Sequence, residues 1–286
     1  MGNIEIICPL YNAEKYIENL DKSLKKQKNV EIKKISYILT ESQDKTKELL
    51  DKINAEYSVI KKEEFSHSLV RENVALKSEA DILVFITQDI EIINDNWLEN
   101  LVNPIINNEV VATFSRQITK YDNIEKYTRE KNYPEKSYIV SKIDLEKIGL
   151  RAFFFSDASS AIKTEIYKKL NGYDGKNLPT NEDQYIAYKI ITNGYKIKYC
   201  ADSVVYHSHK FTLKQLYKRY YDTGVFYAKE NYLDNYGTTK TGGGLATYIL
   251  KRAFQDKNWK VIIRFLPDMG VRFIGMKMGK INGKQN

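Results

Sequence analysis

The first hundred residues alternate short apolar runs, rich in β-branched side chains, with stretches whose apolar residues repeat at helical spacing. Strands are predicted at four of these runs: Ile4 to Cys8, Ile35 to Leu39, Tyr57 to Ile60 and Ile82 to Ile86. Helices are predicted over three stretches: from a cap at Asn12 through Leu24, over Leu69 to Leu76 and over Trp97 to Ile106. Because strands that alternate with helices form crossover connections, we expect an α/β fold with a mainly parallel sheet flanked by helices.

The composition is that of a folded chain without low-complexity segments. Of the 286 residues, 42% are hydrophobic, and only 5 are proline and 14 glycine. The two cysteines, Cys8 and Cys200, are compatible with a reducing compartment. The N-terminus lacks signal-peptide features, and apolar runs such as Ile82 to Ile86 are far shorter than the ~20 residues that cross a bilayer. We therefore expect a cytoplasmic protein.

Two later segments depart from this alternation. Residues 116–142 lose periodicity and are rich in Tyr, Lys and Glu, which predicts an irregular excursion over one face of the sheet. From Phe211 the pattern becomes helical, and the glycine-rich stretch Gly237 to Gly244 interrupts it. We predict a hinge there, with an α/β domain over residues 1–236 and a helical extension over residues 237–286.

Most of the net charge of +8 lies near the C-terminus, where nine Lys or Arg residues after residue 250 face two Asp residues. Large apolar side chains such as Trp259, Phe265 and Phe273 interleave with these cations. This pattern is typical of a helix at the inner, anionic face of a membrane, but it also fits an amphipathic helix packed on the main domain. The apolar content disfavours nucleic acid as a partner.

Polar residues follow three of the predicted strands, at the edge where open parallel sheets bind ligands. They are Pro9, Tyr11 and Asn12 after the first strand, Glu41 to Asp44 after the second, and Gln88 and Asp89 after the fourth. The Asp89 carboxylate is placed to bind a divalent cation that bridges to the phosphates of a nucleoside diphosphate. Alternatively, these residues only cap helices and turns. No GxGxxG or GxxxxGK[ST] motif occurs, which excludes the common dinucleotide and P-loop classes.

Two of the three histidines and one aspartate are further candidates for chemistry. If residues 204–209 are extended, His207 and His209 share one face and can bind a metal or a diphosphate; the alternative is a structural, hydrogen-bonded histidine. Asp183 follows Thr180 at a predicted helix start. There it is either the acidic partner of a capping box or an ionised carboxylate that acts as a general base.

Six short segments occur in the order and spacing of one known family: Cys8-Pro9-Leu10-Tyr11-Asn12, Ser42-Gln43-Asp44-Lys45-Thr46, Val70-Arg71-Glu72-Asn73, Thr87-Gln88-Asp89, Asn171-Gly172-Tyr173-Asp174 and Asn181-Glu182-Asp183. Over roughly the first 230 residues, the chain resembles the family 2 glycosyltransferases. The resemblance implies a GT-A fold, which is a Rossmann-like domain that binds a nucleotide sugar. It also implies an enzyme that inverts the anomeric centre.

More specific segments resemble the rhamnosyltransferase branch of that family. They are Phe65-Ser66-His67, Ser115-Arg116-Gln117, Asn132-Tyr133-Pro134, His207-Ser208-His209, Arg219-Tyr220-Tyr221-Asp222-Thr223-Gly224 and the basic tail from Arg272 to Lys280. This branch implies dTDP-L-rhamnose as the donor and a lipid-linked or growing cell-surface polysaccharide as the acceptor. Thr40-Glu41 replaces the family's usual Asp after the second strand, so a UDP- or GDP-sugar donor stays open. A basic membrane-surface binding protein is the non-enzyme alternative.

The resemblance also implies roles for single residues. Asp183 would be the catalytic base, and Asp89 with His207 would bind Mg²⁺ or Mn²⁺. The donor would be bound by Pro9, Tyr11, Asn12, Glu41, Asp44, Arg71, Gln88, Asp89 and Asp157. Of these, Arg71 would lie near the diphosphate and Asp157 beneath the sugar. Glu182, Arg116 and His209 would contact the acceptor or support the site.

Overall fold

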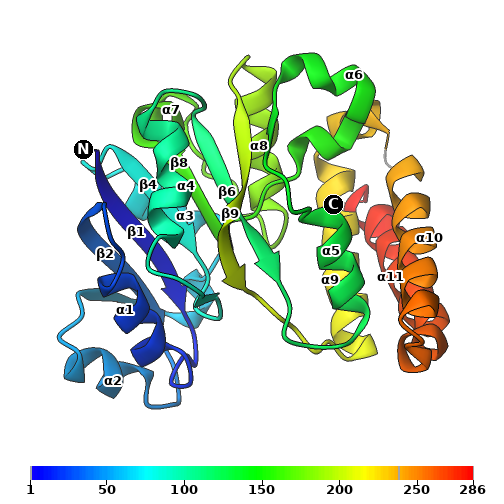
Figure 1. The fold of residues 1–286 in the computed structure, drawn as a ribbon, viewed down its shortest axis with the longest axis horizontal. Helices are drawn as coiled ribbons and strands as arrows, with labels where there is room; N and C mark the ends of the chain where they lie inside the picture. Colours follow the sequence, from blue (N-terminus) through cyan, green and yellow to red (C-terminus); the bar gives the residue numbers. More distant parts are fainter. Residues whose placement is uncertain (1, 238, 286) are drawn as a thin grey trace.

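The computed structural model describes residues 2–237 and 239–285 (Figure 1). A mixed nine-stranded sheet forms its centre, with the strand order β3-β2-β1-β4-β8-β6-β9-β5 and β7 paired to β9. The strands are β1 (Asn3–Leu10), β2 (Glu31–Thr40), β3 (Tyr57–Ile60), β4 (Ile82–Ile86), β5 (Glu91–Ile92), β6 (Ala112–Ile118), β7 (Tyr138–Val140), β8 (Ser159–Lys163) and β9 (Ile197–Tyr206). The four strands predicted from the apolar runs are confirmed.

The sheet is parallel in its first half and mixed in its second. β3, β2, β1 and β4 run parallel, whereas β8 is antiparallel to both β4 and β6, and β9 is again parallel to β6. Every residue of β4 is buried, as expected for a central strand covered on both faces. The carboxyl ends of β1, β2 and β4 therefore meet at one edge, as predicted.

Helices cover both faces of the sheet. They are α1 (Ile17–Lys25), α2 (Thr46–Lys52), α3 (Leu69–Ala75), α4 (Trp97–Ile106), α5 (Ile124–Asn132), α6 (Leu145–Ile148), α7 (Thr164–Lys169), α8 (Glu182–Thr192), α9 (Leu213–Lys229), α10 (Thr239–Gln255) and α11 (Trp259–Gly283). α4 has the predicted bounds, and α3 ends one residue before its predicted end. The predicted cap at Asn12 is wrong: the helix begins at Ile17, because Asn12 is in the left-handed region (φ 47°) and bonds to a neighbouring loop.

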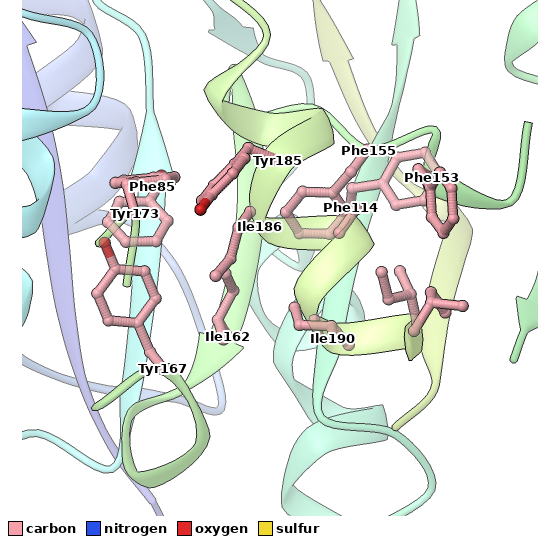
Figure 2. Close-up of a cluster of buried hydrophobic side chains, with 14 of the residues drawn as sticks. Phe85, Phe114, Phe153, Phe155, Ile162, Tyr167, Tyr173, Tyr185, Ile186 and Ile190 are labelled. Carbon is pink, nitrogen blue, oxygen red and sulfur yellow. The ribbon is translucent and has the colours of Figure 1, made fainter. Parts of the chain in front are cut away.

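The alternating side chains of the strands build a core on each face. On one face, Phe85 and Phe114 pack with Ile186 and Ile190 of α8, as Figure 2 shows. On the other, Ile6 and its neighbours pack with the buried residues of α1 and α4. Each fully buried side chain of this kind contributes about 1.5–3 kcal/mol to stability.

The segment 116–142 is not the irregular excursion that its composition predicts. β6 continues to Ile118, and α5 begins after Asn123, whose side chain accepts a hydrogen bond from the N–H of Glu125. Only Ile124 and Tyr127 of α5 are buried, and they pack against residues of α10 and α11. Few apolar residues repeat at helical spacing in this segment, because only two side chains of α5 are buried and they pack against the C-terminal helices.

The C-terminal helices lie on the side of the molecule away from α1 and α2 (Figure 1). Part of the predicted hinge lies outside the described residues, since residue 238 is not described. Gly237 has φ 74°, but Gly243 and Gly244 lie within α10, so the helix continues through the predicted break. The division into domains at residue 237 stays a prediction. Among the described residues, no helix combines the length and apolar character that a membrane span requires.

α11 packs along α9 through glycines. A Cβ placed on Gly279 would lie 2.0 Å from the carbonyl oxygen of Tyr221, and one on Gly224 would lie 2.3 Å from that of Met276. Neither glycine can carry a side chain, because the two helix backbones are in direct contact there. The same face of α11 also buries Gly275 and Gly283.

Candidate active site

One carboxylate and two imidazoles converge where β4 and β9 end. One ligand atom from each of Asp89, His207 and His209 lies within 4.8 Å of the other two. Nε2 of His207 lies 3.6 Å from Oδ1 of Asp89, and Nδ1 of His209 lies 3.7 Å from Oδ2. Sequence reasoning paired Asp89 with His207 as ligands and placed His209 in a supporting role, whereas the structure brings all three together.

The environment of His207 suits a metal ligand. Its Nδ1 lies 2.8 Å from Oε1 of Gln117, an atom that only accepts hydrogen bonds, so Nδ1 carries the hydrogen and Nε2 keeps its lone pair. Burial, and then the guanidinium of Arg129, hold the pKa of His207 well below its usual value. A neutral imidazole next to a carboxylate and a second imidazole is a donor set that fits a divalent cation such as Mn²⁺.

The loops after β1 and β2 are joined by hydrogen bonds from the residues predicted to bind the donor. Tyr11 donates its N–H to Oε1 of Gln88 (2.7 Å), and Nε2 of Gln88 donates to the carbonyl of Tyr11 (2.9 Å). Asn12 donates its N–H to Oγ of Ser42 (2.9 Å). Both ends of the Gln88 amide are therefore engaged in holding the first loop.

Asp44 makes a further link between these loops. One of its oxygens accepts the N–H of Glu14 (3.0 Å), and the other accepts the N–H of Thr46 (3.1 Å). Partial burial opposes the charged form, but the hydrogen bond from Oγ1 of Thr46 (2.5 Å), together with these two backbone bonds, lowers the pKa of Asp44. Tyr11 and Glu41 are exposed beside this linked pair of loops, and Pro9 is half-buried. These exposed side chains are accessible to a ligand at this edge of the sheet.

A buried ionic cluster lies beneath this edge of the sheet. Arg71 is only 2% exposed, donates from Nη1 to the carbonyl of His67 (2.7 Å) and lies 3.6 Å from Glu182. Asp157 is also buried and accepts hydrogen bonds from Tyr173 Oη (2.6 Å) and Ser160 Oγ (2.8 Å). Because a buried charge needs a partner, Arg71 and Glu182 depend on each other.

Asp183 lies in the first turn of α8 beside this cluster. The helix is capped by Asn181 in the left-handed region (φ 61°) without a side-chain cap, so the capping box expected as the alternative for Asp183 does not form. Oδ1 of Asp183 accepts the N–H of Gln184 (2.7 Å). Burial, followed by the charges of Glu182 and Asp157, raises the pKa of Asp183 well above its usual value. Raised basicity suits a group that must accept a proton.

Comparison with known proteins decides the family. The model of the family "Glycosyl transferase family 2" matches residues 5–170. This chain is a family 2 glycosyltransferase. The resemblance stated from the sequence is thus confirmed, including its likeness to the rhamnosyltransferase branch, because two proteins with that name match nearly the whole chain.

These two relatives are O-antigen chain rhamnosyltransferases. RfbN of Salmonella typhimurium is 31% identical over 284 residues, which is 97% of this chain and 89% of RfbN. WbaN of Salmonella anatum is 32% identical over 288 residues, which is 98% of this chain and 90% of WbaN. Coverage this high includes most of the C-terminal helices.

Solved structures show the same fold at low sequence identity. A mannosyltransferase from Pyrobaculum calidifontis, in complex with GDP-Man and Mn²⁺, has a TM-score of 0.63 over 97% of this chain and 86% of that one, at 14% identity. TarS 1-349 from S. aureus with UDP-GlcNAc has a TM-score of 0.61 over 88% of this chain and 73% of that one, at 19% identity. The glycosyltransferase therefore has the predicted GT-A fold.

Three residues of this family 2 glycosyltransferase near Asp89, His207 and His209 were not predicted from the sequence as site residues. Gln117 and Arg129 contact His207, and the charge of Arg219 acts on both Asp183 and His207. Gln117 and Arg219 lie in segments noted for their resemblance, but nothing in their spacing indicates these contacts. Arg116, predicted to contact the acceptor, is paired with Glu135 at 3.1 Å.

Proposed function

We propose that this glycosyltransferase transfers L-rhamnose from dTDP-L-rhamnose to a hydroxyl of a lipid-linked or growing cell-surface polysaccharide, with inversion at the anomeric carbon. The likeness to RfbN and WbaN over nearly the whole chain supports the sugar and the class of acceptor. The convergence of Asp89, His207 and His209 at the edge that also presents the donor loops carries the proposal, because it provides a place for the diphosphate.

Proton transfer is assigned to Asp183. Its carboxylate takes the proton of the acceptor hydroxyl while the oxygen bonds to the anomeric carbon. The bond from that carbon to the diphosphate oxygen breaks, and its electron pair leaves with the nucleoside diphosphate. Attack from the face opposite the leaving group inverts the configuration. General-base catalysis of this kind is worth about 10²- to 10⁴-fold in rate.

The remaining residues hold the donor and balance its charge. A divalent cation, Mg²⁺ or Mn²⁺, held by Asp89, His207 and His209, would neutralise the charge that develops on the leaving diphosphate. Two of the neighbours in fold contain Mn²⁺ and a nucleotide sugar, which supports this assignment. Arg71 acts as a buried positive charge on the donor side, and Asp157 forms part of the wall beneath the sugar.

The donor is tested by nucleoside diphosphate release from a panel of dTDP-, UDP- and GDP-sugars, with Mg²⁺, Mn²⁺ or EDTA. We expect release from dTDP-L-rhamnose that EDTA abolishes. Preference for a UDP- or GDP-sugar would contradict dTDP-L-rhamnose as the donor but would leave the proposed mechanism unchanged. Glu41, which replaces the family's usual Asp, would then be the first residue to test for contact with the nucleobase. Nucleoside diphosphate release that is unchanged in EDTA would contradict the requirement for a divalent cation.

We further propose that the enzyme works on the inner face of the cell membrane, bound through residues 237–286. Large apolar side chains spaced four, three and seven residues apart line one face of α11: Trp259, Ile263, Leu266 and Phe273 are 58%, 78%, 77% and 68% exposed. Exposed cations such as Lys260 and Lys277 border this apolar face. Apolar groups bordered by cations match an anionic lipid surface.

A further inference from the structure

A row of charged and polar side chains leads from α11 to the candidate metal ligand His207. Nη2 of Arg272 in α11 lies 3.6 Å from Oε1 of Glu125, in the first turn of α5. The other oxygen of this carboxylate, Oε2, lies 3.8 Å from Nε of Arg129, one turn further along α5. Arg129 in turn donates from Nη1 to Oε1 of Gln117, the oxygen that also contacts Nδ1 of His207. The row therefore connects the C-terminal helix to the metal site through Glu125, Arg129 and Gln117.

Arg272 is held at the start of this row by two further contacts. Its Nε donates to the carboxylate of Asp268, one turn earlier in α11, and its Nη1 donates to Oη of Tyr220 in α9 (2.6 Å). Each nitrogen of the guanidinium thus faces a different partner. Because the group is planar and rigid, it cannot turn away from Glu125 without losing its contacts with Asp268 and Tyr220.

The charged side chains of the row are largely shielded from water. Those of Arg272, Glu125 and Arg129 are 12%, 14% and 13% exposed. Ion pairs at an exposed surface contribute about 0–1 kcal/mol, but a shielded charge that loses its partner is costly, so the remaining charges shift to compensate it. Among the described residues, the ion-pair partners of Glu125 are Arg129 and Arg272. Loss of Arg272 would leave the whole carboxylate of Glu125 to Arg129.

The position of Arg129 affects the protonation of His207. Oε1 of Gln117 has two lone pairs, so it can accept from Arg129 and from Nδ1 of His207 at once. An arginine favours a carboxylate that offers both oxygens, since it then forms two parallel hydrogen bonds. With both oxygens of Glu125 available, Arg129 would move away from Gln117. The Gln117 amide could then turn its NH₂ group toward Nδ1, which would place the imidazole proton on Nε2 and remove the lone pair that faces the metal site.

We propose that Arg272 of α11 is a positioning residue for the metal site. By holding Glu125, it leaves Arg129 on Gln117, and the Gln117 amide keeps Nε2 of His207 unprotonated and directed at the cation. The inference rests on the proposed function, in which a divalent cation binds at His207. The C-terminal helix then contributes to the metal site without contacting the metal.

The test measures the affinity of the full chain for Mn²⁺ by calorimetric titration, without donor or acceptor. Arg272→Gln should weaken Mn²⁺ binding about tenfold, the effect of removing support from a metal ligand. The direction of the change is diagnostic. If only the charge of Arg272 acted on the site, its loss would favour a cation, and Mn²⁺ would bind equally well or more tightly. Either of those results would overturn the proposal.

Arg252→Gln is the matched control. Arg252 of α10 lies 2.8 Å from Glu130, the residue that follows Arg129 in α5, so this variant also removes an ion pair between a C-terminal helix and α5. It leaves the row from Arg272 to His207 intact and should bind Mn²⁺ as the native chain does. Equal losses in Arg252→Gln and Arg272→Gln would refute the proposal, because the effect would then come from loosened packing of α5.

A second substitution tests whether Arg272 acts through Glu125. Glu125→Gln should weaken Mn²⁺ binding, and the double variant should bind no more weakly than Glu125→Gln alone; losses that add would contradict the row. If Arg272→Gln does not fold because Asp268 is left unpaired, Arg272→Gln with Asp268→Asn removes both charges and takes its place. A native chain that binds no Mn²⁺ would defeat the proposed metal and this inference together, whereas native binding that Arg272→Gln leaves unchanged would defeat this inference alone.

Discussion

Nδ1 of His207 lies 2.8 Å from Oε1 of Gln117, and this one contact determines which nitrogen of the imidazole is available to a metal. Gln117 is itself fully buried and held by a hydrogen bond from its Nε2 to Oγ of Ser156 (2.8 Å). The amide cannot rotate to present its NH₂ group to His207 without turning that group toward Nη1 of Arg129, which donates to the same oxygen. The histidine is therefore fixed with Nε2 directed at Asp89 and His209.

Substituting Gln117 should weaken metal binding without removing a ligand. Gln117→Leu removes the acceptor for Nδ1–H, and we expect the affinity for Mn²⁺ to fall about 10- to 100-fold. Gln117→Glu keeps an acceptor oxygen and should lose less. Calorimetric titration with Mn²⁺ measures both. An unchanged affinity in Gln117→Leu would show that the tautomer of His207 is not set by this contact.

Replacement of Asp183 should separate catalysis from donor binding. Asp183→Asn keeps the shape of the side chain but cannot accept the proton, so turnover should fall about 10²- to 10⁴-fold. The affinity for the donor, measured by calorimetry, should change less than about threefold, since the donor is held by other residues. Turnover close to that of the native enzyme would show that Asp183 is not the general base.

The raised pKa of Asp183 predicts a pH dependence of both activity and stability. The base must be ionised, so kcat/KM should rise with pH through a range above the usual carboxylate pKa of 3.8. In the folded protein the carboxyl holds its proton to higher pH than in the unfolded chain. Its contribution to folding is therefore largest below pH 3.8 and is lost as the pH rises through the raised pKa.

This linkage makes Asp183→Asn a stabilising change at neutral pH. We expect the free energy of unfolding to increase by on the order of 1 kcal/mol at about pH 7, with no gain at about pH 4. Denaturant unfolding of the two proteins at both pH values measures the difference. If Asp183→Asn were less stable than the native chain at neutral pH, the raised pKa of Asp183 would be contradicted.

Two glycines of α11 form a matched pair for testing the contact with α9. Gly279→Ala places a methyl group 2.0 Å from the carbonyl oxygen of Tyr221 and should destabilise the protein by about 1–3 kcal/mol. Gly270→Ala meets nothing within 4 Å and should gain up to about 1 kcal/mol from helix propensity. Unfolding in urea compares them, and equal effects of the two substitutions would refute the close backbone contact.

The membrane proposal predicts the effect of two exposed apolar residues of α11. The double variant Ile263→Asn and Leu266→Asn should bind vesicles containing phosphatidylglycerol at least about tenfold more weakly, because two exposed apolar side chains are lost. Ile143→Asn is the control, since Ile143 is 88% exposed but lies outside the C-terminal helices. Flotation measures the bound fraction, and equal binding by the double variant and the control would defeat the proposal.

Sequence patterns predict those helices and strands that bury their apolar side chains in the core around the sheet. The apolar run of β4 and the periodicity of α4 indicate their structures directly, because each buries its apolar residues in the core around the sheet. The periodicity does not reveal α5, because its two buried residues pack against helices more than a hundred positions away. The antiparallel direction of β8 likewise depends on its neighbours rather than on its own residues.

The same distinction holds for the candidate site. Asp89 follows an apolar strand and His207 and His209 are two residues apart, so residue type and spacing alone indicate a metal site. The contact of Gln117 with His207 and the effect of Glu182 on Asp183 depend on which side chains the fold brings together. Sequence spacing therefore predicts candidate ligands, whereas their protonation depends on contacts between residues far apart in the chain.

The glycine contact between α9 and α11 has a geometric consequence. A helix held by flexible side chains can roll about its axis or slide by a residue, whereas here any such slip would press a Cβ against the backbone of α9. The contact therefore resists rotation and sliding of the apolar face of α11 relative to α9. An enzyme that rests on a lipid surface through this face would therefore pass its contact with the membrane to α9 as to a single rigid pair of helices.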